Sequence, residues 1–331
     1  MYPPQTTSMH HNNFVRRAEK LNMVDRQLQS PVRPVVYQLF LALCLLFVPT
    51  ATATYSIVAT DATTRQVGGA GATCLGGIDL YEALYHSVPN RSVLHTQGLL
   101  LDPNDPIVTT ALDMMQKNES LDAILQEMQD LDQGSFPLNE AVNIPNVALR
   151  QYTIANFTSQ VGYSGAGLFG VWAYYGFGSS ELVNEGKDLL KDRYMYRTAG
   201  NVVKVGTVDA MQNGFEDEDD QFNFGLCDMA GKLMTAMYKV ADGGFGDDRC
   251  LNFDGTSGTG AYLHIDNADG TEFIHINVID SNPKEPVEEL KERFLEWRKL
   301  NPCNSTCDNT SLRFKVAWNG KRIMRDCSWI G

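Results

Sequence analysis

Residues 54–74 read TYSIVATDATTRQVGGAGATC, and this stretch decides the fold. Residues 54–60 form a short β-branched run that favours a strand, and the polar residues 61–64 predict a turn into a second strand over 66–74. Gly68, Gly69 and Gly71 leave the second strand almost without side chains. Such a strand indicates either that a backbone or a ligand approaches closely or that the sheet packs tightly on a helix.

The rest of the chain alternates between strand and helix patterns. Strands are expected at 92–98, on both sides of Asn156 within 150–165, at 197–205, and in a hairpin formed by 260–266 and 271–280. Helices are expected over 109–130 in two pieces, over 208–215, over 224–240, and from Pro286 onward. Strands, then helices, then strands again predict an α+β sandwich rather than regular βαβ units.

An apolar run precedes this region at 35–48 (VVYQLFLALCLLFV), after several basic residues. It is shorter than the ~20 residues that a membrane-spanning helix needs, and Ala51-Thr52-Ala53 fits signal peptidase. The sequence therefore predicts a signal peptide over 1–53 with a long basic region, and no stable membrane insertion after cleavage. Initiation at Met23 and an uncleaved signal anchor are the alternatives.

Composition and cysteine content agree with secretion into an extracellular or luminal compartment. The chain has 331 residues, is 43 % hydrophobic and carries a formal net charge of −13, which argues against nucleic acid as a partner. Cys44 would leave with the signal, and an even number of cysteines remains for disulfides of open pairing. These cysteines are Cys74, Cys227, Cys250, Cys303, Cys307 and Cys327. Glycosylation sequons occur at Asn90, Asn118, Asn156, Asn304 and Asn309.

Several motifs resemble known binding or catalytic patterns but lack the neighbouring structure or ligand spacing that those patterns require. Residues 165–170 fit G-x-G-x-x-G but precede a glycine-broken aromatic stretch instead of a helix, so no dinucleotide site is expected. The acidic run 216–220 lacks the ligand spacing of a calcium loop. His264 and His275 would face each other if Asp269-Gly270 formed a two-residue turn, whereas a four-residue turn would separate them. Because two imidazoles alone seldom make a metal site, we expect neither a metal nor a cofactor.

Thr54 carries the catalytic hypothesis. A threonine hydroxyl is a poor nucleophile unless a base takes its proton, and the free α-amine of an N-terminal threonine supplies that base from the same residue. Cleavage after Ala53 would make Thr54 such a residue, and an α-amine titrates near ~7.7–8.0. The alternative is that Thr54 merely happens to follow the signal.

The motifs around Thr54 resemble those of the domain of unknown function 1028 (DUF1028) family. The opening 54–61 and 66–77 look like that family's first two strands. Further similar segments follow in order over roughly 54–300: His95-Thr96-Gln97, Arg150-Gln151-Tyr152, Gly200-Asn201, the run 246–250 (GDDRC), and 280–290. The family in turn resembles N-terminal-nucleophile hydrolases, so the resemblance implies a four-layer αββα sandwich in which the first strand ends inside the active cleft.

The resemblance also suggests roles for individual residues. Thr54 would be nucleophile and base, Asn201 an oxyanion donor, and Gln97 a group that orients the substrate. Asp247 and Arg249 would bind a substrate carboxylate or pair structurally, and Gly68 and Gly69 would leave room for the substrate. Cys74 and Cys250 lie beside two matched motifs and are the first choice for a disulfide. Ala199 replaces a glutamine of the family pattern, and no lysine lies between Thr54 and Lys117.

The sequence thus predicts three segments: a signal peptide (1–53), an N-terminal-nucleophile-like domain (54–300) and a cysteine-rich tail (301–331). The favoured function is a secreted amidohydrolase acting through Thr54 on a small-molecule or peptide substrate. A catalytically silent module that binds a small ligand or glycan is the alternative, and a purely structural extracellular protein is a third. The sequence is compatible with a homo-oligomer.

Overall fold

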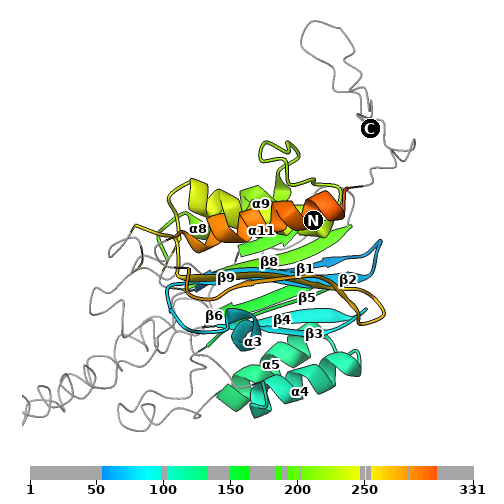
Figure 1. Cartoon of the computed structure of the whole chain (residues 1–331). Helices are drawn as coiled ribbons and strands as arrows, with labels where there is room; N and C mark the ends of the chain where they lie inside the picture. Colours follow the sequence, from blue (N-terminus) through cyan, green and yellow to red (C-terminus); the bar gives the residue numbers. More distant parts are fainter. Residues whose placement is uncertain are drawn as a thin grey trace, which may run out of the picture. The chain divides into compact units, whose positions relative to one another are not determined.

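The hairpin at Thr54 forms the centre of a six-stranded sheet in the computed structural model of the chain (Figure 1). Strands β1 (Thr54–Asp61) and β2 (Gln66–Thr73) pair antiparallel, as the sequence predicts. The sheet has the order β10-β9-β2-β1-β8-β7, and all of its pairs are antiparallel. The outer strands are β7 (Asn184–Lys187), β8 (Tyr194–Asn201), β9 (Gly260–Asp266) and β10 (Glu272–Val278).

The structure describes residues 54–97, 103–132, 150–164, 184–187, 193–201, 203–246, 250, 255–281 and 284–303. All of them belong to one compact unit, Thr52–Gly331. The predicted signal peptide, the glycine-rich motif at 165–170, Asp247, Arg249, Cys307, Cys327, Asn304 and Asn309 lie outside the described residues. Within the described part of the chain, no helix has the length and apolar character that crossing a membrane would require.

A second antiparallel sheet has the order β3-β4-β5-β6. Its strands are β3 (Tyr85–Val88), β4 (Ser92–Gln97), β5 (Gln151–Asn156) and β6 (Gln160–Ser164). Three of these strands follow the predicted pattern, whereas β3 and the short helix α3 (Leu80–Leu84) were not predicted. Both unpredicted elements are only one turn or one short run long, so hydrophobic periodicity has too few residues to reveal them.

Helices cover the outer faces of the two sheets (Figure 1). The larger sheet packs against α8 (Thr207–Glu216), α9 (Met229–Asp242) and α11 (Pro286–Leu300). The smaller sheet packs against α4 (Pro106–Gln116) and α5 (Leu121–Asp132). The predicted mixed fold is confirmed as two antiparallel sheets with helices packed on them (Figure 1).

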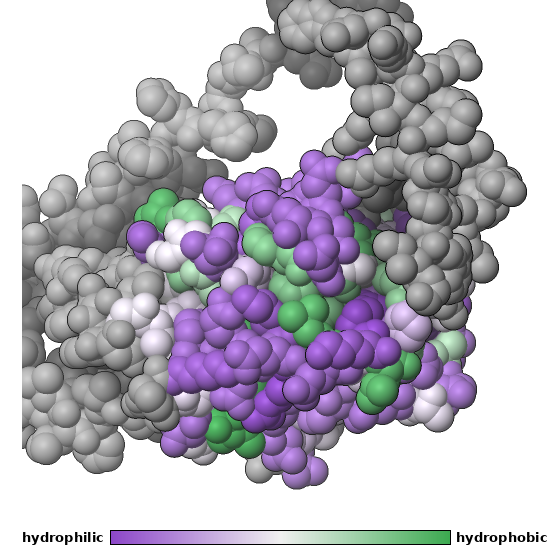
Figure 2. All heavy atoms as spheres, turned by 45° about the horizontal axis from the view of Figure 1, so that its top comes forward, coloured by the Kyte–Doolittle hydropathy of each residue, from purple (hydrophilic) through white to green (hydrophobic). Residues whose placement is uncertain are grey.

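Strand β1 is buried on both faces because it lies between the helices and the second sheet. Tyr55, Ile57 and Ala59 belong to the core under the helices, whereas Val58 belongs to the core between the sheets. Alternation along a strand therefore also turns Thr54, Ser56 and Thr60 toward the second sheet. On the helical side, the surface turned forward in Figure 2 is largely hydrophilic with small separate apolar patches.

One predicted helix boundary was wrong. Residues 224–228 precede helix α9, which begins at Met229. Gly225 has a φ of 74°, outside the helical region, and the Asp228 carboxylate accepts a 2.9 Å hydrogen bond from the backbone N–H of Gly231. An aspartate cap of this kind marks the helix start more strongly than the apolar residues upstream of it.

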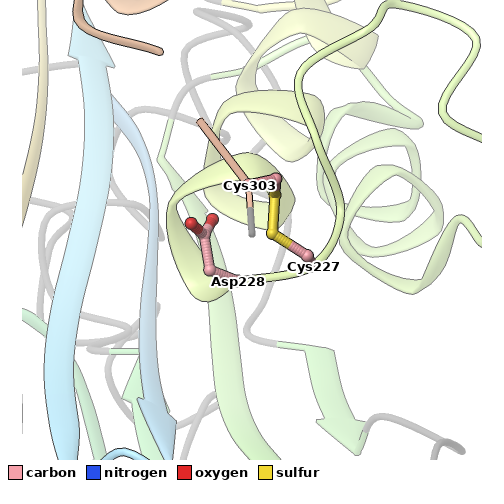
Figure 3. Close-up of side chains that lie close together, drawn as sticks. All are labelled: Cys227, Asp228 and Cys303. Atoms are coloured by element: carbon pink, nitrogen blue, oxygen red, sulfur yellow. A yellow bond between two sulfur atoms is a disulfide. The ribbon is translucent and has the colours of Figure 1, made fainter. Parts of the chain in front are cut away.

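Two disulfides connect distant parts of the chain. Cys74 and Cys250 form the disulfide that the family resemblance suggested. Cys227–Cys303 links the start of α9 to the segment after α11, so Cys303 is bonded to the main domain (Figure 3). Disulfides are typical of proteins that fold in an oxidising compartment.

Candidate functional site

Thr54 lies in a row of buried polar residues across three neighbouring strands. The strand register places Thr73 of β2 directly opposite Thr54 on one side and Asn201 of β8 directly opposite it on the other. The Thr54 hydroxyl donates to the Thr73 hydroxyl at 3.2 Å, and all three residues are fully buried. Directly opposite residues have Cβ atoms about 4.5–5.5 Å apart, so the Asn201 side chain is within reach of the threonine.

Two glutamines of the second sheet continue this polar region. The Ser56 hydroxyl donates to Gln97 Oε1 at 2.8 Å, and Gln97 Nε2 donates to Gln151 Oε1. Gln151 Nε2 then donates to the backbone carbonyl of Gly200 at 3.2 Å, beside Asn201. A chain of hydrogen bonds therefore runs from β1 through β4 and β5 to β8. We call these six side chains the amide end: Thr54, Ser56, Thr73, Gln97, Gln151 and Asn201.

The amide end can supply the parts of an acyl-transfer site without any ionised side chain. It holds a hydroxyl at the first residue of β1 and amide N–H groups in the adjacent strand and the opposite sheet. Burial strengthens such hydrogen bonds, because water does not compete for the donors. The same network could instead serve only to fix how the two sheets pack.

Sequence reasoning selected Thr54, Gln97 and Asn201, and the fold brings all three together. It assigned no role to Ser56, Thr73 or Gln151. The position of Thr73 could have been predicted from the hairpin. A turn over 62–65 pairs residue 61 with residue 66, and the same register pairs Thr54 with Thr73. Gln151 belonged to a matched motif, but its side chain faces Gln97 only because β4 and β5 pair across a long stretch of sequence.

Gly68 and Gly69 contact protein atoms rather than an open space. A Cβ on Gly69 would lie 2.4 Å from Nε2 of His95, and one on Gly68 would lie 2.6 Å from Cγ1 of Ile265. The glycines therefore allow two side chains of this chain to approach the β2 backbone. Their proposed role in making room for a substrate stays a prediction.

Histidines and tyrosines gather at the other end of the sheet interface. His264 and His275 face each other across the β9–β10 pair, with 3.0 Å between their Nδ1 atoms. The Tyr81 ring of α3 lies 4.6 Å from the His264 ring and 4.5 Å from the His275 ring, measured between centroids. The two histidines face each other although the turn is longer than the two residues on which that facing was made to depend, because the register of the pair shifts between Glu272 and Ile274. We call the group His264, His275, Asp266, Glu272 and Tyr81 the histidine end.

Asp266 is the most strongly bonded acid of the histidine end. It accepts hydrogen bonds from His264 Nε2 at 2.9 Å, from the Tyr85 hydroxyl at 2.9 Å and from the Ser87 hydroxyl at 2.6 Å. Burial alone would raise the pKa of Asp266, but the hydrogen bonds, led by that of His264, lower it below the ordinary value. Asp266 is therefore an anion that holds His264 in one orientation.

Two further histidines near this end are held neutral. Burial lowers the pKa of His86 to about 4. Burial, with a smaller contribution from His86, lowers the pKa of His95 well below its ordinary value. His95 Nε2 lies 2.6 Å from the Tyr262 hydroxyl. Only His95 faces the β2 strand across the interface, because His86 lies on the other face of β3, on the side of Leu94 and the helices α4 and α5.

Two other parts of the described chain have some features of a site. Cys227, Asp228 and Cys303 lie close together, and the two cysteines form a disulfide (Figure 3). The Asp228 carboxylate accepts two 2.7 Å hydrogen bonds from Arg298. A polar hollow of about 600 Å³ lies beside α5 and the β5–β6 turn, and both Asn118 and Asn156 line it. Asn90 and Asn118 are exposed and Asn156 is half-buried, so their glycosylation stays a prediction.

Comparison with known proteins supports the resemblance that the motifs suggested. A solved structure from Silicibacter pomeroyi, described as a DUF1028 protein, superposes with a TM-score of 0.51 and 14 % sequence identity. The match covers 84 % of this chain and 98 % of that one. The chain has a DUF1028-like fold. No family model and no curated protein matches the sequence.

The DUF1028-like fold leaves the activity open, because the family is named for a domain of unknown function. At this identity the similarity concerns the fold alone. Function has to be argued from the amide end and its chemistry.

Proposed function

We propose that this DUF1028-like protein is exported, cleaved after Ala53, and hydrolyses an amide bond through Thr54. The observation that carries the proposal is the position of Thr54 at the start of the central strand β1, directly between Thr73 and Asn201. The two disulfides support folding in an oxidising compartment.

In the proposed reaction, the neutral α-amine of Thr54 takes the proton of its own hydroxyl while Oγ1 forms a bond to the substrate carbonyl carbon. The carbonyl oxygen becomes an oxyanion, to which the amide N–H of Asn201 donates a hydrogen bond. Collapse of this intermediate breaks the C–N bond, and the leaving amine receives the proton from the α-ammonium. Water, activated by the same amine, then hydrolyses the Thr54 ester and restores the hydroxyl.

Other residues would bind the substrate. Gln97 would orient it through the amide that also bonds Ser56 and Gln151. Asp247 and Arg249 follow Gly246 and precede Cys250, which is bonded to the residue after β2. In this proposal they would bind a substrate carboxylate, and the substrate would be a small-molecule or peptide amide. The layer order of the fold supports an N-terminal-nucleophile type of site.

One observation favours the alternative, a silent binding module. The polar hollow of about 600 Å³ is lined by Asn118, Asn156 and Arg197 rather than by the amide end. In the uncut chain Thr54 is fully buried. If the hydrolase hypothesis fails, this hollow is where a small ligand or glycan would bind.

The first experiment determines the N-terminus and then the reactivity of Thr54. Secreted protein is examined by Edman sequencing and intact mass, and is treated with an amide-directed electrophile. We expect Thr54 as the first residue, one label in wild type and in Thr54→Ser, and no label in Thr54→Ala. Thr60→Ala is the matched control, because Thr60 lies on the same face of β1 and is equally buried. A blocked or different first residue, or equal labelling in Thr54→Ala, would contradict the proposal.

A further inference from the structure

The histidine end has the features of a transition-metal site. His264, His275 and Glu272 each place one ligand atom so that all three lie within 4.8 Å of one another. The Nδ1 atoms of the two histidines are 3.0 Å apart. Two nitrogens that bind one tetrahedral Zn²⁺ at about 2.0–2.1 Å are separated by a similar distance, roughly 3.3 Å.

The buried histidine is already oriented as metal ligands usually are. His264 Nε2 lies 2.9 Å from Asp266 Oδ1, and a carboxylate can only accept, so the Nε2–H donates and Nδ1 is the ring atom left to bind a metal. Metal-bound histidines almost always donate their other ring N–H to such a partner. Asp266 is itself held by hydrogen bonds from Tyr85 and Ser87, so the group that orients His264 is fixed in position.

A β-bulge supplies the third ligand. The β9–β10 register shifts between Glu272 and Ile274, which leaves Phe273 as the extra residue. Phe273 packs toward the helical core with Ile274, and Glu272 returns to face Asp266 on the histidine side. Without the bulge, Glu272 would share the face of Ile274. Bulges of this kind commonly re-aim a side chain at a functional site.

We propose that His264, His275 and Glu272 bind one Zn²⁺ or a similar borderline transition metal, with a fourth position for water. A set of two imidazoles and one carboxylate suits zinc better than calcium or magnesium. The ion would replace the proton that lies between the two Nδ1 atoms. In a neutral His275 that proton moves from Nδ1 to Nε2 of the same ring, so no net proton is released.

The position of the site indicates its accessibility. His275 and Glu272 are exposed on the outermost strand β10, whereas His264 is 3 % exposed and is covered by Tyr81. An ion can therefore enter from solvent. His264 pairs with Gly69, which pairs with Val58, so the site lies about 13 Å along the strands from Thr54 and two strands away. The proposal is therefore independent of the proposed hydrolase activity.

The test measures Zn²⁺ binding by isothermal titration calorimetry and Co²⁺ binding by visible absorption, using secreted wild-type protein. We expect one ion per chain and a Co²⁺ spectrum of tetrahedral type. His275→Ala should weaken binding about 100-fold or more, and Glu272→Gln about 10- to 100-fold. Both changed residues are exposed, so the variants should keep the wild-type circular dichroism spectrum.

The control is Glu127→Gln, which removes an exposed carboxylate on α5 away from this group and should bind like wild type. A second variant, Asp266→Asn, keeps all three ligands and should weaken binding about 10- to 100-fold through His264. Absence of Zn²⁺ binding to wild type at millimolar concentration would overturn the proposal. So would an unchanged affinity in His275→Ala, or an equal loss in Glu127→Gln.

Discussion

The two ends of the sheet interface hold polar groups of different kinds. At the amide end, hydroxyls and amides bond one another in a buried network that carries no charge. At the histidine end, an anion, imidazoles and tyrosines lie between buried strands and an exposed sheet edge. The difference indicates two separate tasks: the first end is arranged for hydrogen bonding by uncharged side chains, and the second can exchange protons or metal ions with solvent.

The largest effect on stability should come from the disulfides. Cys74 follows directly after Thr73, so its disulfide holds the amide end in place. Replacing Cys74 and Cys250 by alanine should lower the free energy of unfolding by about 5 kcal/mol, since the bond joins residues separated by 176 positions. The matched pair Cys227 and Cys303, separated by 76 positions, should lose about 1 kcal/mol less. Urea unfolding of both double variants measures the difference, and an equal or reversed order would contradict this expectation.

Gly69 lies between the two ends, because it pairs with Val58 of β1 and with His264 of β9. A larger residue there should lower the free energy of unfolding. In Gly69→Val the new Cβ would lie 2.4 Å from Nε2 of His95 and 2.9 Å from the carbonyl of Ile57. We expect a loss of about 3 kcal/mol or more from overpacking, measured by urea unfolding. Gly76→Ala is the control, because its Cβ would meet its nearest neighbour at an ordinary 3.4 Å. A stable Gly69→Val would show that His95 can move away.

Much of the fold could be predicted from the sequence because its signals are local. The hairpin at 54–74, the two pieces of 109–130 and the helix from Pro286 depend on turns, caps and periodicity within a few residues. The layer arrangement and the Cys74–Cys250 bond came only through the family resemblance. From the sequence no metal was expected at His264 and His275, because the bulge at Phe273 and the support of His264 by Asp266 exist only in three dimensions.

A pH dependence of stability should arise at His86 of β3, on the face of the smaller sheet that packs against α4 and α5. His86 has a pKa of about 4 in the folded protein and about 6.5 when unfolded, so between these values the unfolded state binds more protons. Stability is therefore fully present above pH 6.5 and falls as the pH drops toward 4, by up to about 3 kcal/mol. Unfolding in urea at pH 7.5 and pH 4.5 measures the change, and His86→Gln should make the profile flatter. An unchanged slope in that variant would assign the effect elsewhere.

The amide end should give the smallest effect, and one that is independent of pH over the same range. Gln97→Leu keeps the size of the side chain but removes its hydrogen bonds to Ser56 and Gln151. Leaving buried polar groups without these bonds should cost about 2 kcal/mol. Gln126→Leu on the exposed face of α5 is the control and should change stability by less than about 0.5 kcal/mol. Because no side chain at this end titrates near neutrality, the loss in Gln97→Leu should be equal at pH 7.5 and pH 5 in the uncut chain, which has no free amine at Thr54. A loss that grows at the lower pH would mean that the two ends are coupled, since a change in the amide network would then alter protonation at the histidines.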